Sequence, residues 1–486
     1  MQPPFAHSYV RRPGRFYARV RPTPVPEPRL VILNAGLAAG LGLDADELGV
    51  NAAAMFSGNA PPEDADLIAM AYAGHQFGVF VPSLGDGRAI LLGELPGRDG
   101  TLYDLQLKGA GRTPFSRGGD GRAALGPMLR EYLISEAMHA LGIPTTRSLA
   151  VVSTGETVFR DAPLPGAILT RVARSHVRVG TFQYFAARGD EEAVRILVEY
   201  VIGRHYPELR TAPLPALALL QAVARRQAAL VAQWMLVGFI HGVMNTDNMS
   251  VAGETIDYGP CAFMDQYDPR TAFSSIDQGG RYAYANQAVI AQWNLARFAE
   301  TLLPLIDSDT PRAIERATEV LGPFIGEFET CYLEGMRRKL GLSVALEGDA
   351  ALVKGLLTAM EETRADLTLT FRSLTDELDE AASATPHDSG TGTPLTAWRA
   401  EWHARLAKDP LPQAQRAVQM RAANPAYIPR NHRVQAALDA AQHGDHEPFR
   451  RLLGILQRPY EAQSEFAAYQ APPRPEEQVL ATFCGT

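Results

Sequence analysis

Cysteine is scarce in this chain of 486 residues, which contains only Cys261, Cys331 and Cys484. Three cysteines so far apart cannot form a disulfide scaffold, and they lack the paired spacing of a structural zinc site. Low cysteine use is typical of a reducing compartment. We therefore expect a cytoplasmic protein.

Long apolar runs are also lacking. The best one covers only residues 228–240 and includes Gln233, whereas a membrane-spanning helix needs about 20 residues. Residues 1–30 have no apolar core, so the sequence predicts neither a signal peptide nor a membrane partner. Their arginines and their Pro-rich stretch favour an extended arm over a transit peptide.

A surplus of positive charge is missing as well. The formal net charge is −8 and the pI is near 5.8, which argues against general nucleic-acid binding but allows a local basic pocket for phosphates. A hydrophobic content of 46% with 21% charged residues is ordinary for a globular protein. The length suits roughly three domain-sized units or one two-lobed enzyme with extensions.

Strand-like segments fill the first part of the chain, and helical patterns dominate from residue 214. We expect strands at 89–95 and 103–108, a strand pair at 149–153 and 157–160, and a helix over 127–141 between Pro and Gly signals. This order predicts an α+β fold with two lobes. The expected division is an N-terminal extension packing on the core (1–65), a β-rich N-lobe (66–165), a helical C-lobe (166–380), a linker loop (381–396) and a helical C-terminal region with a tail (397–486).

The polar stretch at residues 241–260 carries the most chemical information and reads HGVMNTDNMSVAGETIDYGP. A loop presents Asp247 and Asn248, and a tight hairpin then brings Asp257 near them. Protein kinases hold a divalent cation on a polyphosphate with an Asp and an Asn of the catalytic loop and the Asp of Asp-Phe-Gly. Here the second motif is Asp-Tyr-Gly, and Asn248 follows Asp247 directly. His241 is expected to brace this loop rather than to react.

The tetrapeptide Gly-Asp-Gly-Arg occurs twice, at residues 85–88 and 119–122. Such a motif alone is more often an ordinary turn. The second copy lies in a Gly-rich loop with Arg112 and Arg117 that leads into a helix N-terminus, where backbone N–H groups bind anions. For this loop we favour phosphate binding over a flexible surface segment.

Lys108 ends the strand at 103–108 on the face opposite to its apolar side chains. A strand lysine that faces a nucleotide neutralises phosphates in kinases and needs a carboxylate to fix it. Glu131 and Glu136 both lie on the following helix, and their spacing does not choose between them. A solvated lysine is the alternative.

Arg171, Arg174 and Arg178 would share one face if their segment were helical. Three guanidinium groups on one face repel one another unless anions or carboxylates pair with them. The two interpretations are a solvated charged face and a phosphate-binding face.

Long motifs in the same order make the chain similar to the selenoprotein O family of kinase-like protein adenylyltransferases. They are YAGHQFGVFVPSLGDGRAILLGE (72–94), the stretch from DLQLKGAGR to PTTRSL (104–149), the loop segment (241–260), PTPVPEPRLV near the start, and NPAYIPRNH (424–432).

The resemblance implies a protein-kinase-like fold that binds ATP in a flipped orientation. It implies Mg²⁺-dependent transfer of AMP to Ser, Thr or Tyr hydroxyls of proteins, with release of pyrophosphate. It also implies Asp247 as catalytic base, Asn248 and Asp257 as metal ligands, and Glu131 as the partner of Lys108. The implied nucleotide-binding residues are Gly85, Gly87, Arg88, Lys108, Asp120, Gly121, Arg171, Arg178 and Asp257.

The C-terminus departs from the family pattern. Some members end in selenocysteine or cysteine followed by two serines, whereas this chain has Cys484-Gly485-Thr486. A redox link from Cys484 to Cys261 is therefore a hypothesis, and an inert tail cysteine is the alternative.

Two other functions use the same residues. A phosphotransferase would need the same lysine, carboxylates and metal ligands, and a non-catalytic ATP-binding pseudokinase scaffold could keep them. The residues also do not distinguish Mg²⁺ from Mn²⁺, because both ions prefer hard oxygen ligands.

Overall fold

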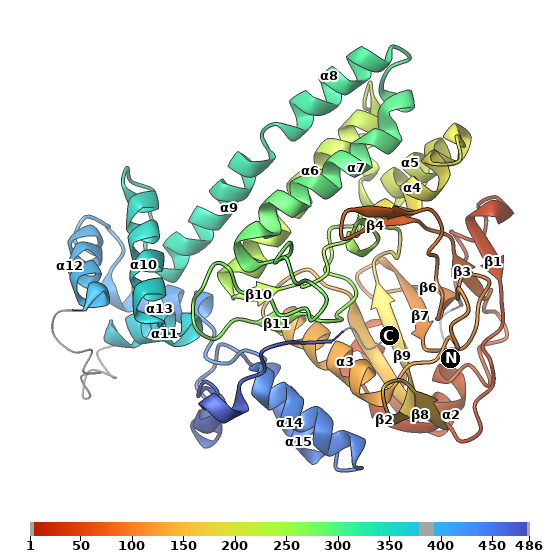
Figure 1. Ribbon diagram of the computed structural model, residues 1–486, viewed down its shortest axis with the longest axis horizontal. Coiled ribbons are helices and arrows are strands. Elements are labelled where there is room, and N and C mark those ends of the chain that lie inside the picture. Colours follow the sequence, from red (N-terminus) through yellow and green to blue (C-terminus); the bar gives the residue numbers. More distant parts are fainter. Residues whose placement is uncertain (1–3, 379–392, 484–486) are drawn as a thin grey trace.

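A seven-stranded antiparallel sheet dominates the first part of the structure (Figure 1). This computed structural model describes residues 4–378 and 393–483, apart from the side chains of Glu47 and Val50. In spatial order the strands are β1 (Tyr17–Arg19), β3 (Ile68–Met70), β6 (Ala89–Pro96), β7 (Leu102–Lys108), β9 (Pro163–Ala173), β8 (Arg147–Phe159) and β2 (Arg29–Leu33). Two-stranded ribbons are formed by β4 (Gly74–Gln76) with β5 (Val79–Val81), and by β10 (Phe239–Ile240) with β11 (Ala262–Phe263).

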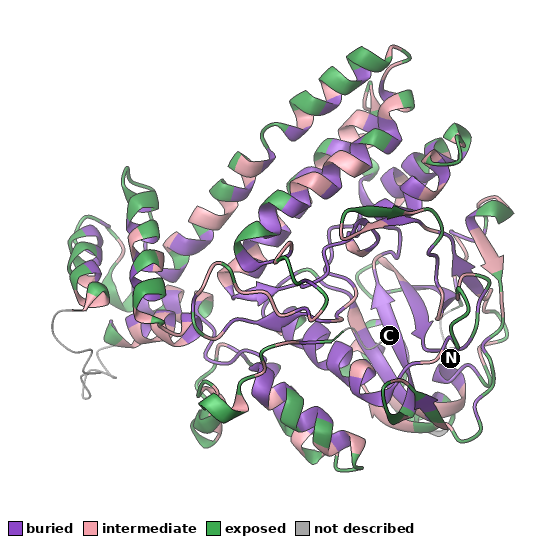
Figure 2. Cartoon of the chain, viewed as in Figure 1, coloured by how far each residue is buried: buried purple, intermediate pink, exposed green. Residues whose placement is uncertain are grey.

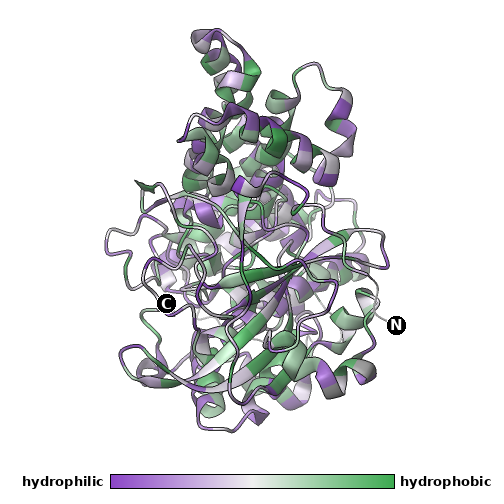
Figure 3. Ribbon diagram, turned by 90° about the vertical axis from the view of Figure 1, so that its right-hand side faces the viewer, coloured by the Kyte–Doolittle hydropathy of each residue, from purple (hydrophilic) through white to green (hydrophobic). Residues whose placement is uncertain are grey.

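Strand β7 shows why the sheet has one apolar and one chemically active face. Leu105 and Leu107 are fully buried in a core shared with the first two helices. Asp104, Gln106 and Lys108 alternate with them and make polar contacts on the opposite face. The alternation predicted for this strand is thus confirmed. Figure 3 shows the sheet as a band of hydrophobic colour.

Helices cover both faces of the sheet. The core on the first face includes Leu48 and Phe56 of α2, and α3 lies across the other face with Met128 and Leu129 in a second core. Figure 2 shows the strands and α3 as largely buried. The helices of this part are α1 (Ala35–Gly40), α2 (Ala45–Phe56) and α3 (Leu125–Ala140).

The second part is helical, as expected from residue 214 onward (Figure 1). The helices are α4 (Val179–Ala186), α5 (Glu191–His205), α6 (Pro215–Leu236), α7 (Gln287–Ile306), α8 (Thr310–Leu321), α9 (Phe324–Lys339), α10 (Asp349–Thr363), α11 (Leu367–Glu377), α12 (Pro394–Leu406), α13 (Gln413–Ala423), α14 (Asn431–Gln442) and α15 (Glu447–Leu456). The mixture of one sheet and many helices agrees with the α+β prediction. Among the described residues, no helix is long and apolar enough to cross a membrane.

One local prediction was wrong. Residues 149–153 and 157–160 do not pair with each other, because they belong to the single long strand β8, which pairs with β9 and β2. At Gly155, between the two segments, the strand has a register shift instead of a turn, and a bulge absorbs a φ of 76°. The condition under which Arg171, Arg174 and Arg178 would share a helical face is not met, since Arg171 lies on β9.

The N-terminal extension does more than pack on the core, because it supplies both edge strands, β1 and β2. Strand β9 crosses the predicted boundary at residue 165. Of the predicted linker, residues 381–392 lie outside the described residues, and residues 394–396 already form the first turn of α12, which Thr393 caps. Cys484 also lies outside the described residues.

Arg430, in the C-terminal motif NPAYIPRNH, joins three distant segments. Its side chain is 1% exposed and binds Asp265, just after β11, and Asp366, the N-cap of α11. We expect Arg430→Met to lower the free energy of unfolding by about 3–5 kcal/mol, because two poorly exposed carboxylates lose their cation. Urea unfolding checks this.

The matched control is Arg451→Met on α15, where the ion pair with Glu447 is exposed at both ends. Exposed pairs contribute about 0–1 kcal/mol. If both variants lowered the free energy of unfolding by the same amount, this would contradict the stabilising role of Arg430.

Candidate active site

A cavity of about 580 Å³ lies where the loops of the sheet meet the polar loop of the helical part. The predicted base Asp247 lines it, and so do all the residues predicted to bind nucleotide or metal: Gly85, Gly87, Arg88, Lys108, Asp120, Gly121, Arg171, Arg178, Asn248 and Asp257. Segments that are up to about 170 positions apart in the sequence therefore contribute to one site. Glu131 lies directly behind Lys108.

Four charged side chains form a compact cluster at the floor of the cavity. Lys108 Nζ lies 2.7 Å from Glu131 Oε2 and 2.9 Å from Asp257 Oδ1. Arg171 on β9 binds the same two carboxylates, with Nη2 2.6 Å from Asp257 Oδ1. Two cations and two carboxylates balance in charge, so each buried group of the cluster has partners of opposite sign.

The cluster also fixes the protonation of its carboxylates. Burial alone would raise the pKa of Asp257, but Lys108 and Arg171 outweigh it and hold that pKa well below its usual value. Burial likewise opposes ionisation of Glu131, and the same two cations lower its pKa. Both groups are therefore anionic near neutral pH.

The choice between Glu131 and Glu136 is decided by position on α3. Glu131 points to Lys108, whereas Glu136 binds Arg147, with its Oε2 2.6 Å from Arg147 Nη2. Glu136 also accepts hydrogen bonds from Asn34 and from the main chain of Ser148. It therefore holds the N-terminal extension to the sheet and is not part of the cavity.

Asp247 lies in the short 3₁₀ turn Thr246–Asn248 and is 7% exposed. Burial raises its pKa to about 6. Its Oδ1 has no hydrogen-bond partner among the described residues. Arg178 fixes the turn from the other side by donating from Nη1 to the carbonyl of Asp247 at 3.1 Å. A buried carboxylate with a raised pKa and an unpaired oxygen, in a residue that lines a cavity, is a candidate to accept a proton.

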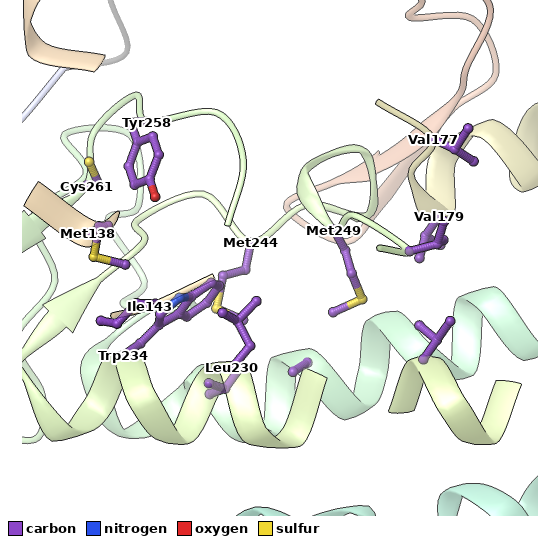
Figure 4. Close-up of a cluster of buried hydrophobic side chains, with 14 of the residues drawn as sticks. Met138, Ile143, Val177, Val179, Leu230, Trp234, Met244, Met249, Tyr258 and Cys261 are labelled. Carbon is purple, nitrogen blue, oxygen red and sulfur yellow. The ribbon is translucent and has the colours of Figure 1, made fainter. Parts of the chain in front are cut away.

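An apolar cluster supports this polar loop from below (Figure 4). Met244 and Met249, on the two sides of the turn, belong to the same buried core as Leu230 and Trp234 of α6. Trp234 donates to Thr255 Oγ1 at 2.8 Å. His241 braces the loop as expected, because its Nε2 lies 2.9 Å from the carbonyl of Ile256.

The two Gly-rich loops are hydrogen-bonded to each other at the roof of the cavity. Thr113 donates to the carbonyl of Asp86 at 2.7 Å, and Ser116 donates to the carbonyl of Gly87. Gly121 must be a glycine, since its φ is 71° and a Cβ would lie 2.1 Å from the backbone of Gly111.

Several lining residues were not assigned a role from the sequence. Arg160 lines the cavity and pairs with Asp120 at 2.8 Å, so Asp120 is engaged before any ligand binds. Tyr72 lies under the guanidinium of Arg178, 4.4 Å from ring centroid to Cζ. The motif at residues 72–94 contributed to the resemblance to the family. No pattern in its first residues distinguished those that line the cavity from those that belong to the core.

The oxygen donors of the site suit a hard divalent cation. Asp247 offers an unpartnered oxygen, and Asn248 uses its Nδ2 to bind the carbonyl of Val243, which leaves Oδ1 as an acceptor. Among the described residues, no group of three or more His, Cys, Asp or Glu side chains could hold a metal. Two carboxylates and an amide are the incomplete set with which Mg²⁺ is usually bound together with substrate phosphates and water.

Comparison with known proteins identifies the family of this chain. The sequence model described as "Protein adenylyltransferase SelO" matches residues 2–457. The chain belongs to the SelO family. Family membership makes it a nucleotidyltransferase, whose substrate is a nucleotide.

Similar SelO-family proteins come from several bacteria. A protein of Rhizobium meliloti is 60% identical over 485 residues, which cover 99% of each chain, and one of Rhodopseudomonas palustris is 59% identical over 492 residues with the same coverage. A protein of Bradyrhizobium is 58% identical. Each is named protein nucleotidyltransferase YdiU.

Proposed function

We propose that this SelO-family chain is a protein adenylyltransferase that transfers AMP from ATP to Ser, Thr or Tyr hydroxyls of proteins. The observation that carries the proposal is Asp247, a buried carboxylate with an unpaired oxygen that lines the same cavity as Lys108 and Asp257. We also propose a protein-kinase-like architecture of two lobes, with the sheet and α3 in the first and α6 and α7 in the second.

Asp247 would take the proton of the acceptor hydroxyl as that oxygen attacks the α-phosphorus. The bond from this phosphorus to the oxygen that bridges it to the β-phosphate then breaks, and pyrophosphate leaves. Lys108 and Arg171 would offset the charge on the leaving group. Asn248 and Asp257 would hold Mg²⁺, or Mn²⁺ in its place, which supplies further charge neutralisation on the phosphates when bound.

A flipped ATP orientation is supported by the distribution of arginines. The cluster at the floor of the cavity is neutral by itself. A bound triphosphate therefore needs cations in addition to Lys108 and Arg171 to balance its charge. Arg178 binds two main-chain carbonyls instead of a carboxylate, and Arg88 and Arg117 also line the cavity. This supply of cations fits a cavity that encloses the terminal phosphates and leaves the α-phosphate beside Asp247.

Labelled ATP tests the reaction. The protein is incubated with acceptor proteins and ATP labelled at the α-phosphate or, separately, at the γ-phosphate. We expect label in protein only from the α position. Label only from the γ position would instead establish a phosphotransferase, and no label with retained nucleotide binding would establish a pseudokinase scaffold.

A further inference from the structure

The β4–β5 hairpin, from Gly74 to Val81, lies against the turn that carries Asp247. Its two-residue turn has φ values of 50° at Phe77 and 84° at Gly78, the left-handed pair typical of a tight hairpin. Among the strands that the structure describes, β4 pairs only with β5. His75 instead donates its main-chain N–H to Thr246 Oγ1 at 2.7 Å.

A closed triangle of hydrogen bonds extends this contact. Thr246 donates its hydroxyl to Gln183 Oε1 at 2.6 Å, and Gln183 Nε2 donates to His75 Nδ1 at 2.8 Å. Thr246 is completely buried and Gln183 is 5% exposed. Burial lowers the pKa of His75, which keeps the ring neutral and able to accept at Nδ1. Three segments, β4, α4 and the turn, are thereby joined.

The hairpin also packs directly against the carboxylate of Asp247. A Cβ at Gly74 would lie 2.4 Å from Asp247 Oδ1, so only glycine leaves room for the carboxylate in its present position. A second hydrogen bond fastens the tip, since Phe77 donates its main-chain N–H to Asn245 Oδ1 at 3.0 Å. Tyr282 donates to the same oxygen at 2.7 Å.

We propose that His75, Thr246 and Gln183 are positioning residues that hold the carboxylate of Asp247 beside Gly74. The inference rests on the proposed function, because positioning matters only if Asp247 reacts. The hairpin thus has a role in AMP transfer although none of the three residues has to touch the nucleotide. Loss of the Thr246 hydroxyl leaves two buried polar groups unsatisfied and removes one of the two hydrogen bonds that join the hairpin to residues 245–246.

Thr246→Val and Thr246→Ser form a matched pair for the test. Valine keeps the shape without the hydroxyl, and serine keeps the hydroxyl. We expect valine to lower kcat for transfer from α-labelled ATP by roughly a hundredfold, the scale of an ångström misplacement, with the KM for ATP unchanged. Serine should keep kcat within about threefold of the wild type. Wild-type kcat in the valine variant would overturn the proposal.

Hydrogen exchange gives a second readout that needs no reaction. Amides of residues 74–77 and 245–248 should exchange faster in Thr246→Val and remain protected in Thr246→Ser. Unchanged protection in the valine variant would refute the positioning triangle. A wild-type protein that transfers no α-label would refute the proposed function alone. If Thr246→Val does not fold, Gln183→Met, which removes the two hydrogen bonds that Gln183 makes in the triangle, replaces it.

Discussion

Asp257→Asn will reduce transfer of AMP by at least about a thousandfold, which corresponds to roughly 4 kcal/mol of transition-state stabilisation. Asp257 lines the phosphate cavity, and it neutralises Lys108 and Arg171. Asparagine keeps the size of the side chain and removes its charge. Incorporation of α-labelled AMP into protein measures the effect.

Asparagine is preferable to alanine at this position for a backbone reason. Asp257 has a φ of 66°, a conformation that Asn tolerates and that strains Ala. Binding of ATP measured without metal should be retained, because the cations of the cavity remain. A variant that transfers AMP at the wild-type rate would remove Asp257 from the proposed metal site.

Asp247→Asn is expected to lower kcat by roughly a hundredfold to ten-thousandfold, the contribution typical of a general base. An amide fits the same place beside Gly74 but cannot take the proton of a hydroxyl. Arg178 binds the main chain of Asp247 and not its side chain, so the turn should keep its position. Single-turnover transfer from α-labelled ATP measures this loss.

The dependence on metal concentration separates the two carboxylates. Asp257→Asn should need more Mg²⁺ for half-maximal residual activity, whereas Asp247→Asn should lose kcat without such a shift. If Asp247→Asn needed more Mg²⁺ and Asp257→Asn did not, Asp247 would be the metal ligand and Asp257 the base. Loss of folding is excluded by equal thermal unfolding midpoints of the variants.

Local patterns predicted the elements that carry the site. Alternation in β7 correctly placed Lys108 on the polar face, and the Pro and Gly signals located α3 to within a few residues. These features depend on neighbours in sequence, which is why they could be read directly. The choice between Glu131 and Glu136 could not, because it depends on the sheet strand opposite each turn of α3.

The remaining errors come from contacts between distant segments. The bulge at Gly155 looks like a turn in the sequence and becomes part of β8 only because β9 and β2 pair on either side. The contact between His75 and Thr246 joins residues 171 positions apart. A Thr in a polar loop and a His beside a glycine give no signal of such a partnership. Kinase-like architecture, domain limits and a cytoplasmic location stay predictions.

The arrangement of the sheet has a consequence for how the chain folds. Strand β2 is made early, yet its partner β8 follows more than a hundred residues later, and such distant pairings slow folding. Until β8 forms, β2 is an unpaired edge. Removal of the first 33 residues would in turn leave β3 and β8 as bare edges of the finished sheet, open to pairing with another chain. The N-terminal segment thus protects the enzyme from aggregation.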